Sequence, residues 1–325
     1  MAAPLLCVAL AACGQDAVPP AAPRSEGALA PMGRFVLFRS GPDGAPLFLD
    51  RFETTRGDVR EFYRQRGEAV PEELVRVWEF HDLDARGTPR HGGNHEDWPA
   101  AGVTLAEAQA IAAWRLGRLP TAGEWAFATG GVVGYRFPWG DTFRGYLCNT
   151  DELDLRHPTA VGTFDPGGYS SGTAFCFDLV GNVAEIVRVP EPERVVRDDE
   201  AEAVPPPVED AGRGANWVAV GWHYLHRYKQ GESPVEDGAI GPLMPADREC
   251  TVGFRVATDP DTLLGALLAR ASGLPEAERR AVAPFLSAYA EVFAPALQRS
   301  LQTGAGRQLE TERWLCHVLG VRAPR

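Results

Sequence analysis

The segment Arg118-Leu119-Pro120-Thr121-Ala122-Gly123-Glu124-Trp125 contains a start signal for a helix. Thr121 and Glu124 have the spacing of a capping box, in which two side chains satisfy backbone N–H groups that the first helical turn leaves without partners. The same spacing recurs in two other pairs, Thr55 with Asp58 and Thr104 with Glu107. The sequence therefore predicts three helices, each beginning directly after its threonine.

Short strands and long loops are expected around these helices. Phe35–Phe38 and Leu47–Asp50 are apolar runs separated by a Gly/Pro-rich turn, which predicts a pair of strands. From residue 130 to 255, Gly, Pro, Trp and Asn recur without sustained periodicity, which indicates loop-dominated structure. Beyond residue 258 the apolar residues return to helical spacing, with Asp261 as the expected first cap.

The bulk composition excludes one class of function. The chain has 325 residues and a formal net charge of −12. Sequence-independent nucleic-acid binding needs a basic stripe that displaces counterions from phosphates, and this sequence has none. The acidic, Pro-rich segment 190–210 is expected to be an exposed insertion, either simply solvated or used as an acidic contact surface.

The first residues resemble a bacterial lipoprotein signal. A short apolar run ends in Leu10-Ala11-Ala12-Cys13 and is followed by a Pro/Ala-rich stretch. We expect residues 1–13 to be a signal peptide ending at a lipidated Cys13, and residues 14–34 to be a linker. The predicted location is the cell envelope, lipid-anchored and facing the periplasm or the surface. The alternative is a dispensable tail on a soluble periplasmic protein.

Several motifs occur in one order along the chain. They are residues 49–55, 94–104, 108–110, 118–125, 137–141, 149–150, 161–162, 178–185, 213–217 and 253–255. Together they resemble the formylglycine-generating (sulfatase-modifying-factor) enzyme family. The resemblance implies an α+β domain of the C-type-lectin-like type over residues 35–257, loop-rich with short strands and a few helices. Residues 258–325 lie outside it as a helical C-terminal extension.

The segment Asp178-Leu179-Val180-Gly181-Asn182-Val183-Ala184-Glu185 suits a hard cation. Two carboxylates flank a Gly-Asn turn whose carbonyl groups can add oxygen ligands. The resemblance implies a structural calcium here, with Asp178 and Glu185 as side-chain ligands and Gly181 and Val183 as carbonyl donors. A second family calcium loop is only half present, through Asn149. We expect one calcium ion; the alternative is a turn held by hydrogen bonds without metal.

The resemblance fails at the catalytic positions. The family's oxidase binds copper(I) through two cysteines, since soft thiolates suit that ion. The aligned residues here are Ala219 and Tyr224, so copper is not expected. Only a convergence of Cys176 with Cys250 would restore a thiol pair. With Cys148 and Cys316, these four cysteines allow three disulfide pairings that the sequence does not rank.

A cluster of polar and aromatic residues follows the last strand motif. It contains Trp217, Trp222, His223, Tyr224, His226 and Arg227, which we interpret as a ligand-binding surface. The predicted function is a non-oxidase scaffold that binds a peptide, protein or glycan. The alternative is a divergent oxidoreductase of the same superfamily, for example a non-haem iron protein using His223, His226 and a carboxylate. A metal pair of His91 and His95 is disfavoured, because both lie in a Gly-Gly loop.

Overall fold

The computed structural model describes residues 32–84, 86–90, 95–164, 176–189, 217–237, 239–269, 274–303 and 309–322. The predicted signal peptide, most of the predicted linker and the acidic insertion lie outside these residues. Among the described residues, no helix is long and apolar enough to cross a membrane.

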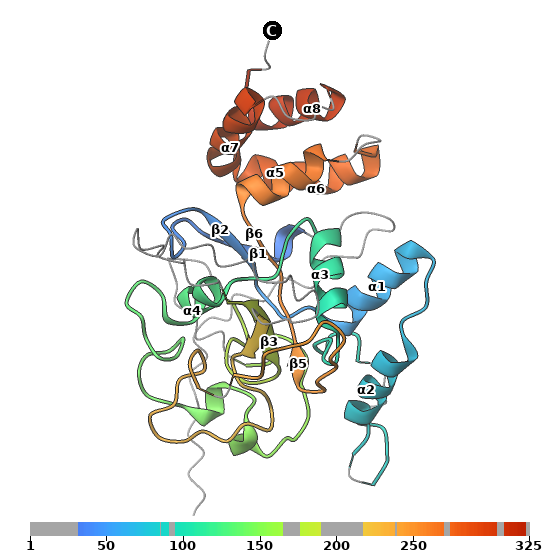
Figure 1. The fold of residues 1–325 in the computed structure, drawn as a ribbon, viewed down its shortest axis with the longest axis vertical. Helices are drawn as coiled ribbons and strands as arrows, with labels where there is room; N and C mark the ends of the chain where they lie inside the picture. Colours follow the sequence, from blue (N-terminus) through green and yellow to red (C-terminus); the bar gives the residue numbers. More distant parts are fainter. Residues whose placement is uncertain are drawn as a thin grey trace, which may run out of the picture.

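Two small sheets form the centre of the domain (Figure 1). The first has the order β1 (Phe35–Phe38), β2 (Leu47–Asp50) and β6 (Ala257–Thr258), all antiparallel. The second has the order β4 (Trp217–Val220), β3 (Ala184–Arg188) and β5 (Val252–Gly253), with β3 and β5 parallel. The predicted strand pair at the start of the chain is confirmed, with Phe35 opposite Asp50.

All three predicted capping boxes are present. They open α1 (Arg56–Arg66), α3 (Leu105–Trp114) and α4 (Ala122–Gly130), and in each case the threonine and the acidic residue bind each other's backbone. One helix that was not predicted, α2 (Glu72–Asp82), stands between the first two. Its first residue follows Pro71, whose side chain cannot cap, so the sequence lacks the signal that marked the others.

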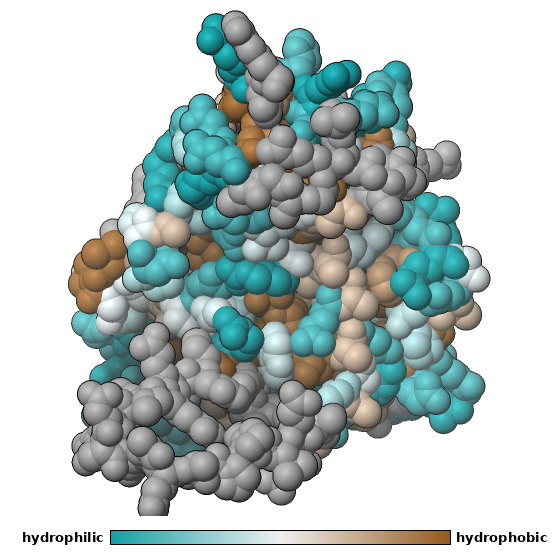
Figure 2. All heavy atoms as spheres, turned by 45° about the horizontal axis from the view of Figure 1, so that its top comes forward, coloured by the Kyte–Doolittle hydropathy of each residue, from teal (hydrophilic) through white to brown (hydrophobic). Residues whose placement is uncertain are grey.

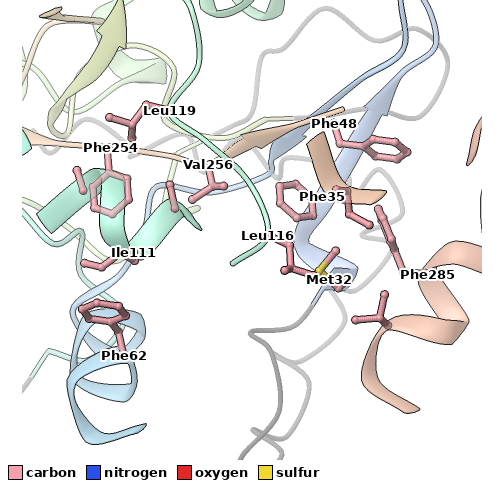
Figure 3. Close-up of a cluster of buried hydrophobic side chains, with 14 of the residues drawn as sticks. Met32, Phe35, Phe48, Phe62, Ile111, Leu116, Leu119, Phe254, Val256 and Phe285 are labelled. Atoms are coloured by element: carbon pink, nitrogen blue, oxygen red, sulfur yellow. The ribbon is translucent and has the colours of Figure 1, made fainter. Parts of the chain in front are cut away.

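The helical extension packs on the first sheet rather than standing apart. It comprises α5 (Pro260–Leu268), α6 (Glu276–Ala288), α7 (Ala290–Thr303) and α8 (Leu309–Leu319), and the cap of α5 is Asp259, not the expected Asp261. The ring of Phe48 on β2 lies 5.1 Å from that of Phe285 and 5.3 Å from that of Phe293. Figure 3 shows Phe285 facing Phe48 and Phe35 across this junction. The extension and the domain therefore share one hydrophobic core.

The residues directly before the predicted domain also pack against it. Met32–Arg34, which the sequence places at the end of a linker, form a short 3-10 helix with Met32 buried. Arg34 Nη1 donates to Asp58 Oδ2 at 2.5 Å, and Arg34 Nη2 donates to the Glu53 carbonyl at 2.9 Å. These contacts fix the entry of the chain against the cap of α1.

Replacing Asp58 by asparagine should lower the free energy of unfolding by about 1–3 kcal/mol at neutral pH, through loss of the Arg34 ion pair and the charged cap. The Arg34 guanidinium holds the pKa of Asp58 below its ordinary value of 3.8 although burial opposes this. A depressed native pKa stabilises the fold above the unfolded pKa, and this contribution disappears as the pH falls further. Urea unfolding should show the deficit shrinking below about pH 4. An equal deficit at all pH values would contradict this account.

Figure 2 shows apolar atoms in separate patches between hydrophilic ones on the visible side. The most exposed large apolar side chains are Phe80 and Tyr146, which are isolated in sequence, and the adjacent residues Val132 and Val133. Small groups of exposed apolar residues are normal for folded proteins and do not by themselves mark an interface.

Candidate functional site

A buried ion pair joins three of the sequence motifs. Glu185 on β3 accepts hydrogen bonds from Arg255 Nη2 at 2.5 Å and from Arg255 Nε at 2.6 Å. Trp125 Nε1 on α4 donates to the same carboxylate at 3.0 Å. All three side chains are fully buried. The capping-box helix, the Gly-Asn segment and the Gly-Phe-Arg segment therefore meet at one carboxylate.

A second carboxylate, Glu53, lies beside this pair. Its Oε2 accepts from Asn182 Nδ2 at 2.7 Å and its Oε1 accepts from the Val183 N–H at 3.2 Å. Burial raises the pKa of Glu53 well above its ordinary value, and the neighbouring Asp178 and Glu185 charges raise it further. Burial likewise raises the pKa of Asp178 to about 7. The carboxyl groups of Glu53, Asp178 and Glu185 thus all lie near one guanidinium group, that of Arg255, which lowers the pKa of Glu53 and of Asp178 and pairs with Glu185.

The calcium site implied by the resemblance fits these residues in part. Glu185 does not fit as a ligand in this arrangement, because Arg255 and Trp125 already engage its carboxylate. Asp178 fits better, because it is buried and its Oδ2 accepts a hydrogen bond from the Gly162 N–H at 2.6 Å. Burial raises the pKa of Asp178, while this hydrogen bond and the Arg255 charge lower it. A set of ligands that contains only oxygen atoms suits a hard cation such as calcium.

Asn149 adds a further oxygen atom to this region. Its Nδ2 donates to Asn182 Oδ1 at 3.1 Å and to the His157 carbonyl at 3.0 Å, while its buried Oδ1 has no hydrogen-bond partner. The Asn149 backbone also lies so close to Gly181 that a Cβ there would meet the Asn149 carbonyl oxygen at 2.3 Å. We therefore keep calcium as a prediction with Asp178, Asn149 and the carbonyls of Gly181 and Val183, and without Glu185.

This prediction has a direct thermal test. At neutral pH, millimolar calcium should raise the midpoint of thermal unfolding, because a ligand that binds only the native state stabilises it by about 2.7 kcal/mol at a hundredfold excess over its Kd. An Asp178→Asn variant should lose the response. Magnesium is the control cation, since it demands a smaller octahedral site. An unchanged midpoint with calcium would mean that hydrogen bonds and protons alone hold this turn.

The residues predicted as a ligand-binding surface do not all face the solvent. Trp222 and Tyr224 are fully buried, and Trp222 Nε1 donates to the Asp237 carbonyl at 2.8 Å. Trp217 is half-buried in β4. His223 is half-buried, and burial lowers its pKa to about 4. Of the predicted set, Arg227 is the most exposed, with 73% of its side chain accessible.

Hydrogen bonds to residues 151, 152 and 232 hold the 221–229 loop, which carries these residues, in place. Arg227 Nε donates to Asp151 Oδ2 at 2.8 Å, and the Tyr228 N–H donates to Glu152 Oε1 at 2.8 Å. His226 stacks on Trp222 at 4.4 Å, and its Nε2 lies 3.2 Å from Glu232 Oε2. These intramolecular contacts stabilise the conformation of the loop in the absence of a ligand.

Comparison with known proteins decides the family. The profile of the sulfatase-modifying factor enzyme 1-like domain matches residues 41–260. This chain belongs to that family. The inactive C-alpha-formylglycine-generating enzyme 2 of Bos taurus is 29% identical over 213 residues, which cover 48% of this chain and 67% of the relative. The Mus musculus protein of the same name is 28% identical over 212 residues, covering 48% and 66%.

The other matches are shorter in sequence or have lower structural similarity. The hercynine oxygenase of Mycolicibacterium smegmatis is 38% identical over 93 residues, 27% of this chain and 21% of that protein. Among solved structures, Treponema denticola variable protein 1 aligns with a TM-score of 0.43 at 15% identity, covering 71% of this chain and 92% of its own. The crystal structure of CarF aligns with a TM-score of 0.39 at 17% identity, covering 66% and 86%.

The two residues that the resemblance aligns with the family's copper-binding cysteines are Ala219 and Tyr224, which contain no sulfur. Ala219 on β4 is opposite Ile186 and fully buried, and Tyr224 is buried in the 221–229 loop. Cys176 lies with the Glu185–Arg255 pair, whereas Cys250 contacts Tyr224, and both are free thiols. Cys148 and Cys316 are also free and buried, so none of the three possible pairings among these four cysteines is formed.

Among the described residues, His95, His223 and His226 do not come together as ligands of one metal ion. His95 stacks on Trp98 at 4.0 Å and its Nε2 contacts the Arg90 carbonyl, while His91 lies outside the described residues. The rings of His223 and His226 are 6.4 Å apart and nearly perpendicular. Across the described part of the chain, no three His, Cys, Asp or Glu side chains could hold one metal ion.

Sequence reasoning missed the residues that organise the site. Glu53, Asn182 and Arg255 were recognised as parts of family motifs, but they were not assigned to the site. Glu53 and Asn182 are 129 residues apart, and Arg255 and Glu185 are 70 apart. The available signal was a charged residue inside an apolar motif, as in Gly253-Phe254-Arg255, since such a residue needs a buried partner.

Proposed function

We propose that this protein is a non-oxidase member of the sulfatase-modifying factor family that binds a peptide segment through the surface of its 221–229 loop. The observation that carries the proposal is the pair Ala219 and Tyr224, both buried, at the positions where the family's oxidase has copper-binding cysteines. Neither side chain supplies a thiolate. The bovine and mouse relatives are themselves named inactive.

The surface of the loop supports binding rather than chemistry. Arg227 and Leu225 are exposed beside half-buried Tyr228, whose ring stacks on Phe143 at 4.2 Å. Aromatic and arginine side chains are enriched where protein surfaces bind peptides. The ion pair to Asp151 and the hydrogen bond to Glu152 fix the loop, which reduces the entropy that a ligand must overcome. Envelope location with a lipid anchor at Cys13 is part of the same proposal.

An array measurement tests this function. The purified full chain is applied to a peptide array and to a glycan array. The Arg227→Gln variant should lose at least about tenfold in affinity for the selected peptides, as expected for an interface arginine. Arg299→Gln on α7 is the matched control, since Arg299 is also exposed and also pairs with an aspartate. Binding to glycans alone would overturn the peptide assignment, and binding to neither array would overturn the scaffold role.

A further inference from the structure

A groove lies between the start of α3 and the segment that leads into β5. Its walls are aliphatic side chains that are each at most 5% exposed: Val103, Leu105, Ile186, Leu243 and Val252. The space within it, including the part open to solvent, is about 200 Å³. Pockets for small-molecule ligands usually enclose about 300–1,000 Å³. The groove is therefore too small for such a ligand and has room for one side chain.

The mouth of the groove carries one adaptable apolar side chain and two carboxylates. Met244 lines the groove and is 38% exposed. Asp247 and Glu249, from the same loop, also line it and are exposed. An unbranched thioether side chain adjusts readily to the shape of a partner. The groove thus combines apolar walls with an acidic mouth.

The arginine between the two acidic residues does not neutralise them. Arg248 Nη1 and Nη2 donate to the Glu107 carboxylate on α3 at 2.8 and 2.7 Å. Its Nη1 also donates to the Gly102 carbonyl at 2.8 Å. Neither Asp247 nor Glu249 forms an ion pair with another described residue, since Arg248 pairs with Glu107. Two carboxylates therefore remain at the mouth without a counter-charge.

Backbone hydrogen bonds hold the loop around the groove in position. The Met244 N–H donates to Asp247 Oδ2 at 2.9 Å, and the Asp247 N–H donates to the Met244 carbonyl at 3.1 Å. The Val252 N–H donates to the Glu249 carbonyl at 2.9 Å. A binding site whose backbone is already ordered loses less conformational entropy when a partner binds.

We propose that this groove binds the side chain of one lysine or arginine of a polypeptide partner. The aliphatic stem lies on the apolar walls and Met244, and the charged group stays at the mouth beside Asp247 and Glu249. Lysine and arginine can bury their stems along apolar surface while the charged group remains in water. An acidic side chain would meet like charges at the mouth. No lining residue belongs to the 221–229 loop, so the inference stands independently of the proposed peptide binding.

Methionine-methyl NMR of the full chain tests the groove. The chain has three methionines, and comparison with a Met244→Leu variant identifies the signal of Met244. A capped tripeptide with a central lysine or arginine should shift this signal saturably. The same tripeptide with a central norleucine has the four-carbon stem of lysine without the charge, so it should bind at least about fivefold more weakly. An unmoved Met244 signal with both basic peptides, or equal affinity for norleucine, would overturn the proposal.

A charge variant separates the acidic mouth from the apolar walls. Asp247→Asn with Glu249→Gln should weaken binding of the lysine peptide at least about fivefold at low salt and leave binding of the norleucine peptide unchanged. Added salt should reduce the advantage of lysine over norleucine, because exposed ion pairs are screened. The matched control is Asp261→Asn with Glu276→Gln, which removes two exposed carboxylates from the extension. An equal loss in this control would contradict the site, since it would reflect net charge alone.

Discussion

Replacing Arg255 by methionine is expected to lower the free energy of unfolding by about 3–5 kcal/mol, because Glu185 would remain buried without its counter-charge. The guanidinium also donates to the Asp50 carbonyl at 3.1 Å and to the Phe177 carbonyl at 2.8 Å. The change therefore leaves several buried acceptors without donors. Urea unfolding followed by tryptophan fluorescence measures the loss.

Two matched variants separate the effect of the buried charge on stability from the effect of the lost side-chain volume. The double variant Arg255→Met with Glu185→Gln should recover part of the loss, since it removes the uncompensated carboxylate. Arg299→Met breaks an exposed pair with Asp261 and should cost less than about 1 kcal/mol. A loss for Arg255→Met as small as that for Arg299→Met would show that this ion pair does not organise the core.

Phe48→Ala should have a comparable effect, a loss of about 3–5 kcal/mol. Phe48 is fully buried, and its ring packs against Phe285, Tyr289 and Phe293 of the extension. The cavity left by the ring would lie at the interface between β2 and the helices of the extension, so both would lose packing contacts.

The control for this prediction is Phe80→Ala, because Phe80 is 67% exposed and its removal should change stability by no more than about 0.5 kcal/mol. Hydrogen exchange of α6 and α7 gives the second readout. These helices should open together with β2 in the unmodified chain and more often in Phe48→Ala. Independent unfolding of residues 274–303 in the unmodified chain would contradict a shared core.

The parts of the fold that the sequence predicted are those with local physical causes. The capping boxes at Thr55, Thr104 and Thr121 each depend on residues three positions apart, so the pattern alone defines the helix start. The helix after Pro71 was missed because no side chain caps it. The expected cap at Asp261 was wrong by two residues, since Asp259 precedes a proline at the first helical position.

The site was predicted less completely because its contacts are long-range. Glu185 was expected to bind calcium, but the residue that engages it, Arg255, is brought there by the pairing of β3 with β5. Trp222 and Tyr224 were interpreted as ligand contacts, yet the aromatic cluster around Phe137 buries the first and His81 covers the second. Polar and aromatic composition indicates a binding loop but not which of its side chains point inward.

The measurement that tests the central claim most directly is mass spectrometry of a sulfatase-derived cysteine peptide incubated with the full chain, copper(I) and oxygen. The residues Ala219 and Tyr224 predict that the peptide's cysteine remains unchanged, because no thiolate pair can hold the copper. A sulfatase-modifying oxidase with both cysteines in place is the positive control. Conversion of the cysteine to formylglycine by this chain would contradict the assignment of a non-oxidase scaffold.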